Sequence, residues 1–159
     1  MAGSINPQDA VESIIAYLTS NLGTKLDALD TSYGDSITLP DVDAYHRAPQ
    51  SIYQGSHNIV VAASATEPDN TPEVLQAHQI ELLIVLTEGG SSATYKATEL
   101  LQIKLWRIVR GIQELLNKST LSDAVDKVLM ENAEASEVFS DNGRVYEQMA
   151  RLTLLIQTS

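Results

Sequence analysis

The sequence predicts an α+β domain, in which two principal α-helices pack on a mostly antiparallel β-sheet. Two long segments carry apolar residues at helical spacing, and several other segments alternate apolar and polar residues, as half-buried β-strands do. A turn signal near the C-terminus indicates an antiparallel hairpin. The order is helix, three strands, helix and two strands, and 159 residues fit one domain spanning residues 1–159.

The first helix is predicted from Pro7 to Ala28. Asn6 suits the N-cap, and Pro7 suits the first helical position because its missing N–H needs no partner there. One narrow apolar stripe follows, formed by Val11, Ile14, Ile15, Leu18, Leu22 and Leu26. We expect this stripe to lie on the core. The segment Asp30–Ser36 has the composition of a turn.

Three strands are predicted next. Ile37–Tyr45 is interrupted by Pro40, which favours an edge strand or a bent strand. His57–Ala65 and His78–Glu88 are clearer strands, joined by the polar loop Glu67–Gln76. The strand His78–Glu88 is apolar on both faces, with Ile80, Leu82, Ile84 and Leu86 on one and Leu83 and Val85 on the other.

The second helix is predicted over Ala93–Asn117, with Ser91 or Ser92 as its N-cap. Gly89 and Gly90 precede this cap as a turn between strand and helix. The helix should end before the sequence STLSD, which has the composition of a break.

The last part of the chain is predicted to form a hairpin. Ala124–Val138 fits either a short helix or a strand, and Ser140–Arg144 is a hairpin turn signal. The turn would pair a strand ending near Phe139 with a final strand, Val145–Gln157, in which apolar and polar residues alternate. We expect this hairpin to hold the C-terminal strand, which would otherwise fray.

Composition excludes several classes of function. The chain has no Cys, so it has neither disulfides nor thiolate chemistry. Its net charge of −11 argues against a general nucleic-acid binder, because neutralising phosphates requires Lys and Arg. Met1–Asn6 lacks the basic cluster of a signal peptide, and no apolar run is long enough for a membrane helix, so we expect a soluble, cytoplasmically made protein.

The sequence shows no catalytic constellation, and it predicts no enzyme, no cofactor and no metal site. His57 and His78 should lie at opposite ends of one hairpin and His46 in a loop, so exposed or capping histidines are expected. Asp41 and Asp43 would share a solvated strand face rather than act as an acid–base pair or as cation ligands. The GGSS turn lacks a phosphate-loop motif, and a plain turn is the simpler interpretation.

The second helix carries the most informative surface. Lys96, Lys104, Arg107, Arg110 and Lys118 fall on one side of a helical wheel. The opposite, core-facing arc holds Ala97, Leu101, Leu105, Ile108, Ile112, Leu115 and Leu116. Apolar Leu100, Ile103 and Trp106 lie on or beside the basic side, and Gly111 there would allow a close approach.

Two interpretations of that helix remain open. One is a solvated amphipathic helix with scattered surface apolar residues, which are common. The other is a contact surface, since Arg and Trp are favoured interface anchors and an acidic protein offers an acidic surface on a neighbouring copy. On the second interpretation, the subunit or partner interface is formed by Leu100, Ile103, Trp106, Arg107 and Arg110.

The layout of nearly the whole chain resembles the tail terminator (tail completion) proteins of long-tailed bacteriophages. The resemblance lies in the order of five parts. An N-terminal helix (DAVESIIAYLTSNL) and the extended segment YHRAPQSIY precede two strands (NIVVAAS and QIELLIVLTE) joined by a polar loop. A long helix (KATELLQIKLWRIVRGIQELL) and a closing hairpin that ends in YEQMARLTLLIQ follow.

The resemblance implies a virion structural protein that forms a ring, usually a homo-hexamer. Such a ring caps the tail tube, stops its polymerisation and joins the tail to the head–neck. It implies partners in the tail tube protein and a connector or neck protein, with a sheath protein as a further candidate, and no membrane. DNA only passes through an acidic lumen, and the protein is located in the virion after viral tail assembly in the host cytoplasm.

Two other functions stay open. A different neck or head-completion connector ring subunit would share a small α+β architecture, and binding to the portal side rather than to tube subunits would identify it. A small ligand-binding domain or enzyme would be a monomer or dimer with a pocket holding perturbed titratable groups. The loop Glu67–Gln76 is a candidate contact arm that becomes ordered on assembly.

Overall fold

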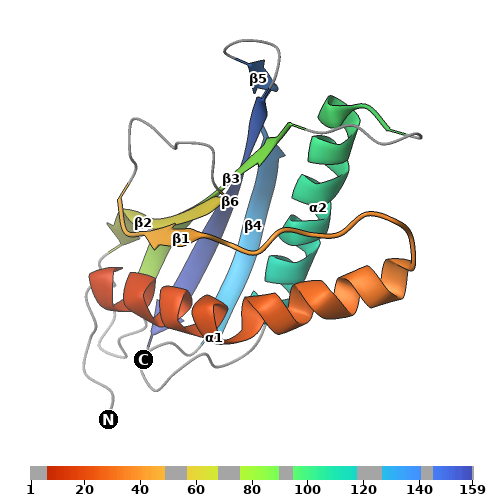
Figure 1. The fold of residues 1–159 in the computed structure, drawn as a ribbon. Coiled ribbons are helices and arrows are strands. Elements are labelled where there is room, and N and C mark those ends of the chain that lie inside the picture. Colours follow the sequence, from red (N-terminus) through yellow and green to blue (C-terminus); the bar gives the residue numbers. More distant parts are fainter. Residues whose placement is uncertain are drawn as a thin grey trace.

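A computed structural model describes residues 7–48, 57–67, 76–89, 95–117, 127–140 and 145–158 of the chain. Two helices and six strands lie within these ranges (Figure 1). In chain order they are α1 (Pro7–Tyr33), β1 (Ala44–His46), β2 (Asn58–Glu67), β3 (Gln76–Glu88), α2 (Ala97–Leu116), β4 (Lys127–Ala135), β5 (Phe139–Ser140) and β6 (Tyr146–Thr158). The predicted α+β class is therefore confirmed.

The strands form one sheet in the order β1-β2-β3-β6-β4, and β5 pairs with β6 as well. All pairs are antiparallel except β1 with β2. The C-terminal strand β6 is central: it pairs with β3 from Gln76↔Thr158 to Glu88↔Tyr146, while β4 and β5 pair along its other side. It is thus held by two neighbours rather than by its hairpin alone.

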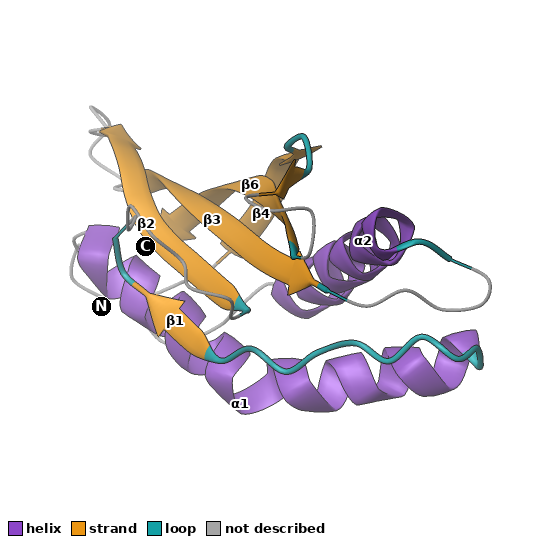
Figure 2. Ribbon diagram, turned by 45° about the horizontal axis from the view of Figure 1, so that its top comes forward, coloured by secondary structure: helices purple, strands orange, loops and turns teal. Residues whose placement is uncertain are grey.

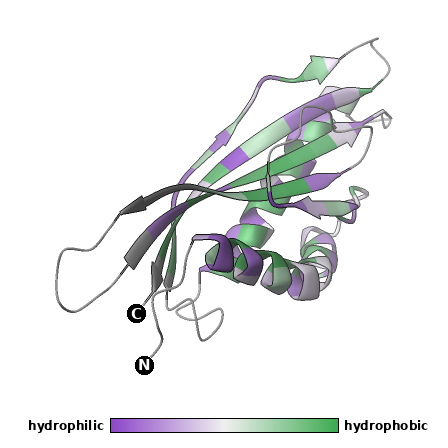
Figure 3. Cartoon of the chain, turned by 90° about the vertical axis from the view of Figure 1, so that its left-hand side faces the viewer, coloured by the Kyte–Doolittle hydropathy of each residue, from purple (hydrophilic) through white to green (hydrophobic). Residues whose placement is uncertain are grey.

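Both helices cover the same face of the sheet (Figure 2). The core between them is built from alternate strand residues, since successive side chains of a strand point to opposite faces. The sheet contributes mainly Ile59, Val61, Ile80, Leu82, Ile84, Leu86, Ala150, Leu152, Leu154 and Ile156 to this core. Along both helices, apolar and polar positions are mixed, as expected for elements buried on one side only (Figure 3).

Helix α1 is longer than predicted. It continues past Ala28 because Leu29 is buried in the core, and it ends where Gly34 adopts a positive φ of 61°. The amide of Gly34 donates to the carbonyl of Asp30 at 3.1 Å, which satisfies one of the last carbonyls of the helix. The predicted turn at Asp30–Ser36 was therefore placed too early.

The predicted strand Ile37–Tyr45 is mostly wrong, because only Ala44–His46 pairs, and it does so in parallel with β2. Earlier in the connector, at Ile37 and Leu39, the backbone amides donate to side chains instead of to a strand. The amide of Leu39 donates to the Asp30 carboxylate at 3.0 Å, and that of Ile37 donates to Asp35 at 3.1 Å. The connector still contributes two buried side chains, Ile37 and Leu39.

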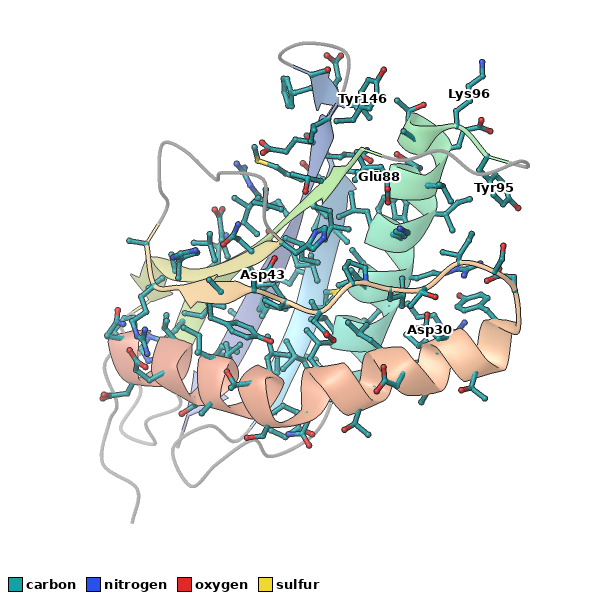
Figure 4. All side chains as sticks on the ribbon, in the orientation of Figure 1. Asp30, Asp43, Glu88, Tyr95, Lys96 and Tyr146 are labelled. Atoms are coloured by element: carbon teal, nitrogen blue, oxygen red, sulfur yellow. The ribbon has the colours of Figure 1, made fainter. Side chains whose placement is uncertain are left out.

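Helix α2 begins at Ala97, four residues later than predicted, so an N-cap at Ser91 or Ser92 is wrong. The cap is Lys96, whose backbone amide donates to the Glu99 carboxylate at 3.1 Å. Figure 4 shows Tyr95 and Lys96 at this start of the helix. The two serines themselves lie outside the described residues.

In the C-terminal half, the structure decides between the helix and the strand that were both open for one segment. Most of Ala124–Val138 is the strand β4, not a helix. The predicted hairpin is confirmed by the antiparallel pairs Phe139↔Glu147 and Ser140↔Tyr146, although residues 141–144 are outside the described part of the chain. The loop between Glu67 and Gln76 is outside it as well, so its role as a contact arm stays a prediction.

Candidate interaction surface

The core-facing side of α2 agrees with the predicted wheel. Leu101, Leu105, Ile108, Ile112 and Leu116 are buried in the core, while Ala97 and Leu115 are partly exposed. The opposite, basic side faces the C-terminal half of α1 and the connector that follows it. This neighbour was not anticipated, because residues 33–35 and α2 are far apart in the sequence.

Arg107 is held by that connector. Its guanidinium makes a two-pronged contact with the Asp35 carboxylate, at 3.1 Å from Nη1 and 2.6 Å from Nη2. It also lies 3.8 Å from the centre of the Tyr33 ring, a cation–π distance. The hydrogen bond from Arg107 lowers the pKa of Asp35, and the same bond raises the pKa of Arg107.

Arg110 belongs to a neighbouring network. Its Nη1 donates to the Tyr33 hydroxyl at 2.9 Å, and its Nε donates to the Glu114 carboxylate at 3.1 Å. Lys25 of α1 approaches the other oxygen of Glu114 at 2.6 Å. Hydrogen bonds from Lys25 and Arg110 lower the pKa of Glu114. The network joins the two helices across their exposed sides.

Lys104 also has an acidic partner: it pairs with Glu88 at 2.5 Å, and both side chains are mostly buried. Figure 4 shows Glu88 at the end of β3. Three of the four described cations on the predicted basic side, Lys104, Arg107 and Arg110, are therefore matched by acids of the same chain. Lys96 is exposed, and Lys118 lies outside the described residues.

The five predicted interface residues differ in how far their side chains are exposed. Leu100 is only 8% exposed, Ile103 is partly exposed, and Trp106 is 39% exposed. Arg107 is largely covered by its own contacts, whereas the Arg110 side chain keeps half of its surface exposed. Trp106 and Arg110 are the two most accessible members of the predicted set.

Gly111 allows a close approach, but of α1 rather than of a partner. It is buried, and a Cβ there would lie 3.1 Å from Leu29 Cδ1 and 3.3 Å from Leu26 Cδ2. Such distances are tighter than ordinary carbon contacts, which lie near 3.5–4.0 Å. The missing side chain lets the two helices cross.

A groove of about 400 Å³ lies between α2 and β4, and we call it the α2–β4 groove. It is lined by Trp106, Val109, Arg110 and Gln113 of α2 and by residues 130–133 of β4. In a strand, neighbouring side chains point to opposite faces, yet four consecutive residues of β4 line this groove. The groove therefore follows the edge of β4. No pattern in the sequence pointed to the β4 side of the groove, since that segment fitted helix and strand equally well.

The outer edge of β4 is open within the described part of the chain. β4 pairs with β6 on one side only, and its register shifts between Met130 and Asn132, which leaves Glu131 as a bulge. An open edge presents backbone donors and acceptors to another chain. Trp106 and the open edge therefore lie together at the groove.

His57, directly before β2, contacts Asp43 of the connector that follows α1. His57 and Asp43 exchange two bonds: each amide donates at 2.8 Å, that of His57 to the Asp43 carboxylate and that of Asp43 to the His57 carbonyl. Burial lowers the pKa of His57, and the charge of Asp43 opposes this shift in part.

His78 is fully buried, so the expectation of a solvent-exposed residue is wrong there. His57 and His78 do lie at opposite ends of the β2–β3 pair, as predicted. Among the residues described, no group of three or more His, Cys, Asp or Glu side chains could hold a metal ion. No helix in these ranges has the length and apolarity to span a membrane.

Comparison with known proteins adds little. No family model matches the sequence, and no curated protein matches it. Among solved structures, the chain is similar to one chain of a structure titled "Virion of native gene transfer agent (GTA) particle". That similarity has a TM-score of 0.39 and 10% identity, and it covers 91% of this chain and 97% of the other.

Proposed function

We propose that this protein is a tail terminator subunit of a bacteriophage-like virion. Copies of it form a ring, a homo-hexamer, that caps the tail tube, stops its polymerisation and joins the tail to the head–neck. The observation that carries the proposal is the order of elements in the sequence that resembles this family. The fold contains the helix, the antiparallel strand pair, the long helix and the closing hairpin in that order.

The charge distribution supports a ring through which DNA slides. Six basic side chains of the described residues form ion pairs with acids of the same chain, which engages much of its positive charge. The whole chain keeps a net charge of −11, and Asp27, Asp41, Glu131 and Glu137 are exposed. Like charges keep a polyanion from adhering to a protein wall.

The first test is the size and shape of the purified protein, alone and after addition of tail tubes. Light scattering gives the mass of the particle, and negative-stain images show its form. Closed rings, or a cap at one end of the tubes, are the expected result. A monomer that ignores the tubes contradicts the proposal, and rings that bind the portal side instead favour a different neck component.

A further inference from the structure

We infer that the open edge of β4 and the α2–β4 groove together bind an extended segment of a different protein, which adds to the sheet as a further strand. The partner segment carries apolar side chains at alternate positions and basic side chains between them. The inference goes beyond the proposed function and does not depend on it, because the edge and the groove belong to a single copy of the chain.

The groove is long enough to hold a strand. It continues toward the start of β4 as a second hollow of about 220 Å³. Both elements line this hollow, through Gln113, Leu116, Asn117, Val128, Leu129 and Met130. Gln113 and Met130 line the first hollow as well, so the two are continuous. Together they follow β4 from Val128 to Ala133, which is about 17 Å, the length of roughly six extended residues.

The side of β4 that faces the helices is apolar. Val128 is buried in the core, and Met130 and Ala133 pack against it. Trp106 of α2 is exposed and lines the same groove. A strand added at this edge would turn every second side chain toward α2, and apolar side chains there would cover the indole. In strand addition, main-chain hydrogen bonds supply affinity and alternate side chains supply specificity.

The other face of β4 is acidic. Glu134 points to it, since its pair on β6, Arg151, lies between two core residues. Arg151 itself pairs with Glu81 at 3.9 Å, and Glu131 is exposed at the bulge. Neither Glu131 nor Glu134 has an ion-pair partner among the described residues. Basic side chains at the remaining positions of the added strand would neutralise these two acids.

A second copy of this chain is a poor occupant. Bulges and charged side chains protect edge strands against pairing with their own kind, and β4 has both. Two β4 edges would bring Glu131 and Glu134 of one copy against the same acids of the other. At the other edge of the sheet, the exposed acids Asp41 and Asp43 precede β1. Six of the ten basic side chains are already paired within the chain, so the partner is a different, basic segment.

The fluorescence of Trp106 tests the inference, because it is the only Trp in the chain and it lines the groove. The probe is a hexapeptide with blocked ends in which valine and lysine alternate. We expect a saturable shift of the Trp106 emission to shorter wavelengths, because apolar side chains displace water from the indole. No shift at peptide concentrations up to about 1 mM, where even weak complexes form, overturns the inference.

Two control peptides separate strand addition from unspecific attraction to an acidic protein. In the first, glutamate replaces lysine, which keeps the apolar side chains and reverses the charge. In the second, the backbone amides are N-methylated, which keeps the side chains and removes the donors that pairing with β4 requires. Each control should bind at least about tenfold more weakly than the probe. Equal binding of either control overturns the inference.

Matched charge variants and hydrogen exchange locate the contact. Glu131→Lys with Glu134→Lys should weaken probe binding at least about tenfold, whereas Asp27→Lys with Asp41→Lys, at exposed acids outside the groove, changes the net charge equally and should have little effect. Equal losses in both pairs overturn the inference. In the native protein, the probe should slow hydrogen exchange of the β4 amides and leave those of β1 unchanged. Unchanged exchange in β4 would place the probe elsewhere and refute strand addition.

Discussion

Arg107 illustrates how a single residue acquires a different role once the chain folds. On a helical wheel it belongs to an exposed basic side, but in the fold it binds Asp35 and stacks on Tyr33. The two-pronged geometry suits a guanidinium and not an ammonium group. Arg107 therefore fixes the connector after α1 to α2, and its substitution is not a clean test of an interface.

Arg107→Glu should lower the melting temperature, because it places two carboxylates together at the α1 connector. The charge-swapped double variant Asp35→Arg with Arg107→Glu should recover part of the loss. Thermal unfolding of the two single variants and the double variant forms a cycle that measures the coupling. A single variant as stable as the native protein would show that the contact adds nothing to stability.

His57 should make stability depend on pH in a defined window. Burial lowers its folded-state pKa below the usual 6.5, so the unfolded state binds the proton more readily. Stability is then fully present above the unfolded pKa and falls as pH drops through about 6.5 toward the folded value. Urea unfolding between pH 7 and 5 should show a smaller fall for His57→Gln than for the native chain.

The carboxylates whose pKa is lowered, among them Asp35 and Glu114, do not obscure that window. The pKa values of Asp35 and Glu114 are lowered below 3.8 and 4.5 by their cationic partners. Their contributions are present above the unfolded pKa and are lost only as pH falls through the lower folded pKa. Equal slopes for the native and His57→Gln proteins between pH 7 and 5 would rule out the assigned role of His57.

Among the elements, the crossing of α1 and α2 depends on the small volume at Gly111. Leu26 and Leu29 of α1 occupy the space that a side chain at this position would need. The crossing in turn brings Lys25 to Glu114 and Tyr33 to the two arginines. One glycine thus positions the contacts on the exposed side of the helix pair.

Gly111→Val should destabilise the fold by about 1–3 kcal/mol, the usual cost of overpacking a tight contact. Gly23 of α1 provides the control, because a Cβ there meets nothing within 4 Å. Gly23→Ala should stabilise the protein by up to about 1 kcal/mol through helix propensity. Denaturant unfolding measures both, and equal effects at the two sites would contradict the packing argument.

On the scale of the whole molecule, the sheet is organised around its last strand. β6 lies between β3 and β4, and its Leu152, Leu154 and Ile156 are fully buried. A strand in the middle of a sheet cannot leave without exposing both neighbours. Strand β6 is therefore part of the core.

Removal of residues 152–159 should abolish cooperative unfolding. Truncating one buried Leu or Ile costs about 2–5 kcal/mol, and three are lost, against a typical total stability of about 5–15 kcal/mol. Circular dichroism and thermal unfolding check this. Removal of Thr158 and Ser159 alone is the control and should leave a cooperative transition, and a cooperative fold after the longer deletion would contradict the central role of β6.

Local sequence pattern by itself determined the α+β class, the apolar stripe of α1 and the strands β2 and β3. It also determined the core-facing arc of α2 and the closing hairpin. Those features depend on periodicity and turn chemistry, which neighbouring residues carry. Only the tertiary structure decided that β6 is central, that Arg107 and Arg110 bind the chain's own α1 region, that Gly111 faces α1 and that β4 borders a groove with Trp106. Each of these joins residues distant in sequence, and a helical wheel shows which side a residue occupies but not what will lie against it.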